Sequence, residues 1–364
     1  MPIARRLLLP AFAIPFIARA QTPAPHHDPG RYSTLQGAAV TGLTAPQIAQ
    51  RRTESPAPPG RPGRWEPRAS LPLPRSEMAW AVAMEGRMHL VGGYGEGRVD
   101  RAYHHVYDPA ADRWTTAAPL PRGANHVAVA ADGPFLYALG GFTLQNRRAD
   151  DGCFVWDSRT DRWRAIAPLP RPRGAASAVV RDGHIHLIGG AGDPPDERAS
   201  VAWHEVYFPP TDKWERRRPI PAGRDHAGAV AWGGDIHVIG GRFNTFQDNT
   251  GLHHVYVAGR DQWERRAPMP TARSGHGLAI LAGRFFAMGG EGRDITHGAS
   301  IDSVYGQVES YDPATDTWQS HAPTPTPRHG LGAAAIGDWI YVAGGGPVVG
   351  GGVQSSVHEA FTLG

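Results

Sequence analysis

The sequence predicts an all-β fold, a six-bladed β-propeller in residues 64–364. Three observations predict it. A block of about fifty residues recurs from Trp65 onward, and each block holds an apolar run that ends in a Gly-Gly pair. The last block lacks one element, which the first residues of the repeat region supply. The high contents of glycine (46) and proline (34) also suit short strands joined by turns better than helices.

Each repeat carries the same marks in the same order. The Gly-Gly pairs are Gly92-Gly93, Gly140-Gly141, Gly189-Gly190, Gly240-Gly241, Gly289-Gly290 and Gly344-Gly345. In five repeats an aromatic-led turn follows, and then an Asp-x-Trp sequence that ends at Trp114, Trp163, Trp214, Trp263 or Trp318. A Pro-x-Pro sequence begins five residues after each of these tryptophans, and an arginine opens the next repeat.

Four short strands account for this order in each repeat. The first strand follows the arginine through small residues. The second, such as residues 237–239, ends at the Gly pair, where the backbone turns with positive φ or approaches another chain segment closely. The third leads into the aromatic turn, and the fourth begins near the tryptophan. It ends at Pro-x-Pro, because proline cannot donate to a central ladder.

The last repeat predicts how the ring closes. After Gly344-Gly345 the sequence provides one more strand, residues 357–361, with no tryptophan strand behind it. The missing strand stands at the other end of the repeat region, around Trp65, where Gly63 replaces the Asp of the other repeats. We therefore expect the strand around Trp65 to complete the last blade, which pairs two edges that would otherwise be open.

The N-terminal residues 1–20 are typical of a secretory signal peptide. Two arginines precede a short apolar stretch, and Ala18-Arg19-Ala20 forms an A-x-A cleavage site before Gln21. The arginine pair also partly matches a twin-arginine signal. The apolar stretch is too short for a membrane span. The sequence thus predicts a periplasmic or secreted protein without a membrane span, in which residues 21–63 form a Pro-rich linker or arm.

Charge and cysteine content exclude several kinds of partner. The formal net charge is +3, but the arginines are spread along the chain and Lys213 is the only lysine, so we expect no nucleic-acid partner. Cys153 is the only cysteine, which rules out an internal disulfide and a Cys-based metal cluster. We assign no metal and no cofactor from the sequence, and we expect a monomer.

The order Gly-Gly, Tyr, Trp in units of about fifty residues resembles the kelch motif, over nearly the whole repeat region. This resemblance implies a propeller that binds its ligands through loops around the central axis. Strands two and three of every blade are joined on the face where the next strand one begins, so the loops after the Gly pairs and the opening arginines share that face. A sugar, a glycan or a protein segment is the expected ligand.

The candidate ligand-binding residues fall into two groups. The arginines that open the repeats are Arg75, Arg122, Arg173, Arg224, Arg273 and Arg328. The alternative for them is a structural role, because a feature shared by all blades answers a need of all blades. The loops after the Gly pairs differ from blade to blade, and they carry Tyr94, Asp193, Asp196, Arg242, Asn244, Phe246, Glu291, Arg293 and His297.

Eighteen histidines raise the question of a metal site. Four of them occupy the same third-strand position in four blades and cannot share one ion: His104, His204, His253 and His358. Four others lie near the start of strand one: His126, His226, His276 and His329. These last four could approach the axis, but their distances from the Gly pair differ, so with strand alternation they need not all point inward.

Two kelch groups imply specific chemistry. The chain is similar to the central domain of galactose oxidase, whose copper centre needs a tyrosine cross-linked to a cysteine; Cys153 lies on a third strand away from the axis, and we expect it to pack in the core. The chain also resembles the exported N-acetylneuraminate epimerases in size and architecture. That resemblance implies a carboxylate for proton transfer and an arginine for the substrate carboxylate, roles that Glu291 and Arg293 could take. The leading hypothesis remains a non-catalytic binding module, with a sugar epimerase or mutarotase as the alternative.

Overall fold

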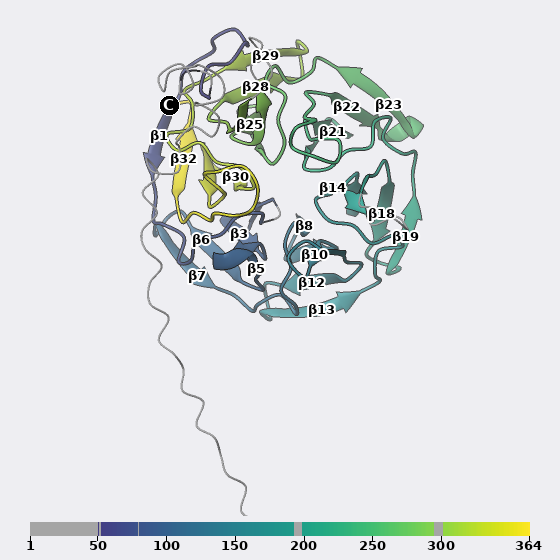
Figure 1. Ribbon diagram of the computed structural model, residues 1–364. Coiled ribbons are helices and arrows are strands. Elements are labelled where there is room, and N and C mark those ends of the chain that lie inside the picture. Colours follow the sequence, from purple (N-terminus) through teal and green to yellow (C-terminus); the bar gives the residue numbers. More distant parts are fainter. Residues whose placement is uncertain (1–49, 51, 79, 193–198, 295–300) are drawn as a thin grey trace, which may run out of the picture.

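The computed structural model describes residue 50 and residues 52–78, 80–192, 199–294 and 301–364. The predicted signal peptide (residues 1–20), most of the predicted linker and the loop residues Asp193, Asp196 and His297 lie outside the described residues. Six four-stranded antiparallel sheets surround one central axis, as the repeats predict (Figure 1). The protein is a six-bladed β-propeller.

The strands of the blades follow the chain from the axis outward. The first blade contains β2 (Val82–Met84), β3 (Arg87–Val91), β6 (His104–Asp108) and β7 (Arg113–Thr116). The second contains β8 (Ala128–Asp132), β9 (Phe135–Leu139), β12 (Cys153–Asp157) and β13 (Arg162–Ile166). The third contains β14 (Ser177–Arg181), β15 (His184–Ile188), β18 (His204–Phe208) and β19 (Lys213–Arg216).

The other three blades repeat this plan. The fourth contains β20 (Gly228–Trp232), β21 (Asp235–Ile239), β22 (His253–Val257) and β23 (Gln262–Arg266). The fifth contains β24 (Gly277–Leu281), β25 (Arg284–Met288), β28 (Val308–Asp312) and β29 (Thr317–Ser320). The sixth contains β30 (Gly332–Ile336), β31 (Trp339–Ala343), β32 (His358–Thr362) and β1 (Arg64–Pro67).

Short hairpins extend the loops between the second and third strands of four blades. They are β4 (Tyr94–Gly95) with β5 (Val99–Asp100), β10 (Phe142–Thr143) with β11 (Arg148–Ala149), β16 (Ala191–Gly192) with β17 (Ala199–Ser200), and β26 (Glu291–Asp294) with β27 (Ile301–Val304). Two 3₁₀ turns also occur among the described residues, η1 (Glu96–Arg98) and η2 (Ala258–Arg260). None of the helical segments among these residues has the length and hydrophobicity that a membrane-spanning helix requires.

The first strand of the chain completes the last blade. β1 pairs antiparallel with β32, and Trp65 stands opposite Phe361 with the two rings 5.2 Å apart between centroids. Gly63 has φ of +69°, in the same left-handed region as the Asp of the other repeats, for example Asp112 with φ of +43°. A Cβ on Gly63 would collide with the Phe361 ring, so glycine meets both demands.

The Asp-x-Trp sequence joins neighbouring blades. The Trp114 indole N–H donates to the carbonyl of Ala69 at 2.8 Å, across the boundary between the last and first blades. Asp112 accepts hydrogen bonds from the Tyr107 hydroxyl at 2.6 Å and from the Ala69 amide at 2.9 Å. Equivalent indole bonds are made by Trp65, Trp163, Trp214, Trp263 and Trp318. The repeated Asp and Trp therefore hold the ring together.

The Gly pairs allow the blades to meet near the axis. Gly189 and Gly190 have φ of +65° and +97°, and a Cβ on Gly189 would collide with the carbonyl oxygen of Arg224 in the next blade. The first strands of the six blades surround a central channel. Residues from the first strand of every blade form its wall; many of them are small, such as Ala130, Ala229 and Ala334, and the channel volume is about 370 Å³.

Residues 52–63, the end of the predicted arm, lie along the outer edge of the fifth blade. Pro59 forms a parallel bridge with Ser320, and the Ser320 amide donates to the Pro58 carbonyl at 2.8 Å. Ala57 is buried in the core cluster that also contains Trp318. This segment covers an edge strand whose backbone groups would otherwise face solvent.

Candidate functional site

Six residues, one from each blade, surround the axis on the face that carries the loops after the Gly pairs. In each blade, the residue just before this one forms a β-bridge with the first residue after the Gly pair, as in Ser76↔Tyr94 and Asp225↔Arg242. All six have positive φ: Glu77, His126, Ala175, His226, Gly275 and Gly330. Each of the last five donates its backbone N–H to the carbonyl of the preceding one, at 2.8–3.1 Å. The backbone thus forms a hydrogen-bonded ring, which we call the axial ring.

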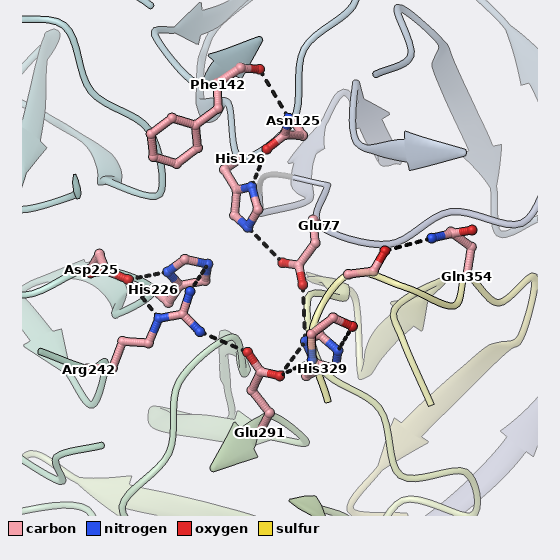
Figure 2. A network of polar contacts seen from close by, with 12 residues as sticks. Glu77, Asn125, His126, Phe142, Asp225, His226, Arg242, Glu291, His329 and Gln354 are labelled. Atoms are coloured by element: carbon pink, nitrogen blue, oxygen red, sulfur yellow. Dashed lines mark hydrogen bonds and ion pairs between the residues drawn. The ribbon is translucent and has the colours of Figure 1, made fainter. Parts of the chain in front are cut away.

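Charged and polar side chains gather above the axial ring (Figure 2). Glu77 lies between two histidines: its Oε2 is 2.9 Å from His126 Nε2, and its Oε1 is 3.2 Å from His329 Nδ1. Glu291 Oε2 lies 3.4 Å from the same His329 nitrogen. We define the axial cluster as Glu77, Asn125, His126, Asp225, His226, Arg242, Glu291 and His329. Five of the six blades contribute to it.

Arg242 connects three other members of the axial cluster: Asp225, His226 and Glu291. Its Nη1 donates to Glu291 Oε1 at 2.8 Å, its Nε donates to Asp225 Oδ1 at 2.9 Å, and its Nη2 donates to His226 Nε2 at 3.1 Å. His226 Nδ1 bonds to Asp225 Oδ1. Because a guanidinium has only donors, His226 must accept at Nε2 and carry its proton on Nδ1. The Arg242 side chain is 15% exposed, more than its two ion-pair partners Asp225 and Glu291.

The cluster shifts the pKa values of its members in opposite directions. Burial acts to raise the pKa of Glu77, but the charges of His126 and His329 hold that pKa well below its usual range. Burial acts to lower the pKa of His329, yet Glu291 and Glu77 raise it to about 9. For His226, burial and the Arg242 charge lower the pKa to about 4. At neutral pH the cluster therefore contains a neutral His226 and an imidazolium at His329.

A glycine-rich loop covers one side of the cluster. His329 Nε2 bonds to the carbonyls of Val348 and Gly350, at 2.8 and 3.2 Å. The Gly350 amide in turn donates to Glu291 Oε2 at 2.7 Å. Gly350 has φ of +72°, which favours glycine at this turn. The loop carbonyls hold the proton on Nε2 of His329, and the loop shields Glu291, which is 2% exposed.

Five of the six predicted opening arginines are fully buried and serve the blades. Arg273 Nη1 donates to Glu309 Oε2 at 2.6 Å, and its Nη2 donates to the Ala287 carbonyl at 3.0 Å. Arg173 and Arg328 make the same two kinds of contact, whereas Arg224 bonds to His254 and Arg75 bonds only to backbone carbonyls. Their contacts match the structural alternative raised from the sequence. In the second blade the equivalent position is Ala124, and Arg122 bonds to the Gly140 carbonyl from two residues earlier.

The structure brings some of the predicted loop residues into the axial cluster and places others outside it. Arg242 and Glu291 meet in the axial cluster, and the buried Tyr94 ring stands edge-on to His126 at 6.0 Å. Asn244 accepts the backbone N–H of Ser200, and Phe246 lies on the same loop, half-buried. Arg293 pairs with Asp302 instead of Glu291, with Nε 2.7 Å from Oδ1. Arg242, and not Arg293, is the arginine that contacts Glu291.

The histidines also separate into two sets. His126, His226 and His329 belong to the axial cluster (Figure 2), whereas His276, one residue beyond the axial ring, is fully buried against Gly228 and Gly240 of the fourth blade. The third-strand histidines are buried inside the blades, three of them paired with a second-strand histidine, as in His186 Nδ1 to His204 Nε2 at 2.9 Å. Cys153 is buried in the core cluster with Tyr137 and Tyr207, and burial raises the pKa of its thiol to about 12.

Sequence reasoning missed Glu77 and Asp225 and did not connect the histidines with Arg242. A signal was present, because the axial-ring position, which stands two residues after the opening arginine in five blades, is Gly or Ala in three blades but Glu or His in the other three. The shift of the second-blade arginine to Arg122 concealed that alignment. The assembled cluster offers an arginine for an anion, carboxylates and imidazoles for proton transfer, and nitrogen and oxygen ligands for a cation.

Comparison with known proteins agrees with this architecture. Residues 125–345 match the family described as KLHDC2/KLHL20/DRC7 Kelch-repeats domain. Kelch-like protein terF of Aspergillus terreus is 30% identical over 307 residues, which cover 79% of this chain and 66% of that protein. Kelch repeat-containing protein At3g27220 of Arabidopsis thaliana is 27% identical over 189 residues (50% and 44%), and Beta-scruin of Limulus polyphemus is 29% identical over 184 residues (49% and 20%).

The chain thus spans between one fifth and two thirds of the length of these three relatives. The match to the family covers more than half of the chain, and the resemblance to the fungal protein covers more than three quarters of it. Blade count, repeat marks and these similarities agree. The chain belongs to the kelch-repeat family of β-propellers, domains that generally serve as protein-interaction modules.

Proposed function

We propose that this protein is an exported binding module that recognises a polar ligand at the loop face above the axial ring. The ligand is a sugar, a glycan or a polar segment of a protein partner, and the propeller acts as a monomer. The observation that carries this proposal is the axial cluster itself. Buried charge is costly, and the blades close without it wherever the ring residue is Gly or Ala, so the cluster serves a need other than the fold.

Arg242 is the group best suited to contact the ligand. It is held by Asp225, Glu291 and His226 while part of its side chain remains exposed. An arginine positioned by such contacts binds a carboxylate, a phosphate or vicinal hydroxyl groups without first losing side-chain freedom. Kelch-like relatives are typically non-enzymatic interaction proteins, which favours recognition without catalysis.

The test is binding of the full-length purified protein to a glycan array and a peptide array, followed by titration of the strongest ligand. We expect Arg242→Gln to weaken binding by about 30-fold or more, because truncating one partner of a buried charge pair commonly costs 2–5 kcal/mol. Arg293→Gln is the matched control, since Arg293 pairs with Asp302 away from the cluster, and it should leave affinity near the wild-type value. Equal binding by both variants would contradict a site at the axis.

Export supports an extracellular or envelope ligand and is tested separately. The proposal rests on the basic start, the apolar stretch and the A-x-A site of residues 1–20. Fractionation of the expressing cells and N-terminal sequencing should find the mature chain outside the cytoplasm, beginning at Gln21. Cytoplasmic full-length protein would refute export and leave the proposed binding site untouched.

One contact favours a second candidate, a sugar mutarotase or epimerase. Glu291 and Arg242 bring a carboxylate and an arginine within 2.8 Å, the two groups that such chemistry needs. Proton NMR of anomeric exchange would test it with N-acetylneuraminate and common aldoses. Catalysed exchange that Glu291→Gln abolishes would establish the enzyme. Exchange no faster than the buffer rate would exclude it for these sugars.

A further inference from the structure

Three residues of the axial ring bring metal-binding atoms together. Glu77, His126 and His226 each offer one ligand atom, and these atoms all lie within 4.8 Å of one another. Glu77 Oε2 and His126 Nε2 are 2.9 Å apart. With bond lengths of about 2.0–2.2 Å, two neighbouring ligands of one ion lie about 3–3.6 Å apart, so this edge needs to open by less than about 1 Å to hold an ion.

The backbone fixes the positions of these three residues. All three occupy the same place in the repeat, with φ of +49° for Glu77 and His126 and +53° for His226. The His126 amide donates to the Glu77 carbonyl at 3.0 Å, and Ala175 continues the ring between the two histidines. The three side chains therefore project from one rigid ring and not from mobile loop tips.

Both histidines have an outer partner of the kind that metal ligands use. His226 Nδ1 bonds to Asp225 Oδ1, and His126 Nδ1 bonds to Asn125 Oδ1. The Asn125 amide cannot be flipped, because its Nδ2 donates to Asp100 Oδ1 at 2.6 Å and to the Phe142 carbonyl at 3.2 Å. With each Nδ1–H held by an oxygen acceptor, each Nε2 turns toward the other members of the triad (Figure 2).

A small cavity lies at the axial ring. Its volume is about 10 Å³, and all six ring residues line it together with Met78 and Trp80. A space of this size corresponds to about one water-sized sphere, too small for an organic ligand. The absence of side chains beyond Cβ at the other three ring positions leaves this space at the axis.

We propose that Glu77, His126 and His226 form a binding site for one divalent transition-metal ion, of the class that two imidazoles and one carboxylate select, such as Zn²⁺ or Fe²⁺. The ion lies between Glu77 and His126, where it replaces their direct contact. Arg242 Nη2, now 3.1 Å from His226 Nε2, withdraws from that nitrogen and keeps its bonds to Asp225 and Glu291.

The test is calorimetric titration of the full-length protein, stripped with a chelator, with ZnCl₂ and, without oxygen, with FeSO₄. We expect one ion per chain. Each of Glu77→Gln, His126→Gln and His226→Gln should weaken binding by more than about 100-fold, since loss of an outer partner alone costs about 10- to 100-fold. Asp225→Ala removes such a partner and should fall in that smaller range. His184→Gln is the control and should leave affinity unchanged, because His184 lies on β15, packs against Phe208 of β18 and does not belong to the axial cluster.

Two further measurements keep the proposal falsifiable if a ligand variant fails to fold. Arg242→Met removes a positive charge beside His226 and should strengthen zinc binding, by about tenfold, although it weakens binding of the polar ligand. Wild-type protein titrated with Co²⁺ should show ligand-field absorption bands of a nitrogen and oxygen site, without a thiolate charge-transfer band. No saturable binding by the wild type, or unchanged affinity in the three folded ligand variants, would overturn the metal site. The array result for the polar ligand does not depend on either outcome.

Discussion

Charged groups are buried in two regions of this propeller, inside the blades and at the axis, and the two regions use them differently. Inside the blades the same pair recurs, an arginine that opens the repeat and a glutamate on the third strand, as in Arg173–Glu205 and Arg273–Glu309. Both side chains of these pairs are inaccessible to solvent. At the axis no two blades contribute the same set of groups, and Arg242 remains partly exposed.

This difference separates structural polar groups from functional ones. The buried opening arginine of five blades donates to backbone carbonyls of its own blade, a need that these blades share, and in three of them a third-strand glutamate pairs with it. An unrepeated buried cluster cannot answer such a shared need, since three blades place Gly or Ala at the same ring position. Both regions contain buried charged groups, so burial alone does not tell a functional region from a structural one. Whether the charged groups recur from blade to blade does.

The histidines inside the blades predict the largest effect, a loss of stability in acid. Burial first, and then neighbouring positive charges, lowers the pKa of His89, His104, His186, His204, His237 and His253 to about 3 or 4. These groups bind protons near pH 6.5 when the chain is unfolded but only near pH 3–4 when it is folded. Their stabilisation is therefore complete above pH 6.5 and is lost as the pH falls toward 4, by about 1.4 kcal/mol per pH unit for each proton taken up.

Urea denaturation at several pH values between 7 and 4 measures this slope. His204→Gln should make it shallower, because the His186–His204 pair, in which one ring donates to the other, no longer takes up the same protons on unfolding. A variant of the exposed residue Asp182, such as Asp182→Asn, is a suitable control. An unfolding free energy that does not change between pH 6.5 and 5 would contradict the structural role of these pairs.

Breaking a repeated ion pair should cost less, but still much of a domain's stability. Arg273→Met leaves Glu309 buried without its guanidinium, and loss of one partner of a buried pair costs about 3–5 kcal/mol. Chemical denaturation at pH 7 measures the loss. The folded fraction of this variant should bind the polar ligand normally, whereas Arg242→Gln should not. Loss of ligand binding in folded Arg273→Met would remove the distinction between the two regions.

His329 predicts the opposite pH dependence from the blade histidines. Glu291 and Glu77 overcome the effect of burial and raise its pKa to about 9. The stabilisation from His329 is complete below about pH 6.5 and is lost as the pH rises through 9, with a slope of about 1.4 kcal/mol per pH unit. The difference in unfolding free energy between the wild type and His329→Gln should therefore shrink from pH 6 to pH 10. A constant difference would show that His329 is not an imidazolium.

The channel beneath the axial ring predicts the smallest effect. Ala229 lines the channel wall without contributing to the axial cluster, and it is half-buried. Ala229→Ser should change the unfolding free energy by less than about 0.5 kcal/mol. Ligand binding and zinc binding should both remain at the wild-type level. A large effect on either would show that the functional region extends down the channel.

The sequence predicted the architecture well because every blade uses the same residues at the same places to form its turns and to contact the next blade. The Gly pairs, the Asp-x-Trp sequences and the splice at Trp65 all lie where the repeats predicted them, and β1 pairs with β32. The site was only partly predicted. Arg242, Glu291 and Tyr94 were candidates and lie in or beside the cluster, whereas Arg293 turns away to Asp302.

What the sequence determined by itself was the set of local and periodic interactions, because strand, turn and blade boundaries depend on residues close together in the chain. Only the tertiary structure decided which unrepeated residues meet. Glu77 and Glu291 are separated by more than two hundred residues, yet both contact His329, since the closed ring brings the ends of six blades to one point on the axis. The ring residue His226 reaches that point, as does His329, one residue before the ring position, whereas His276, one residue after it, packs against Gly228 and Gly240. Local patterns do not encode which side chain reaches the axis, because that depends on how each blade packs against its neighbours.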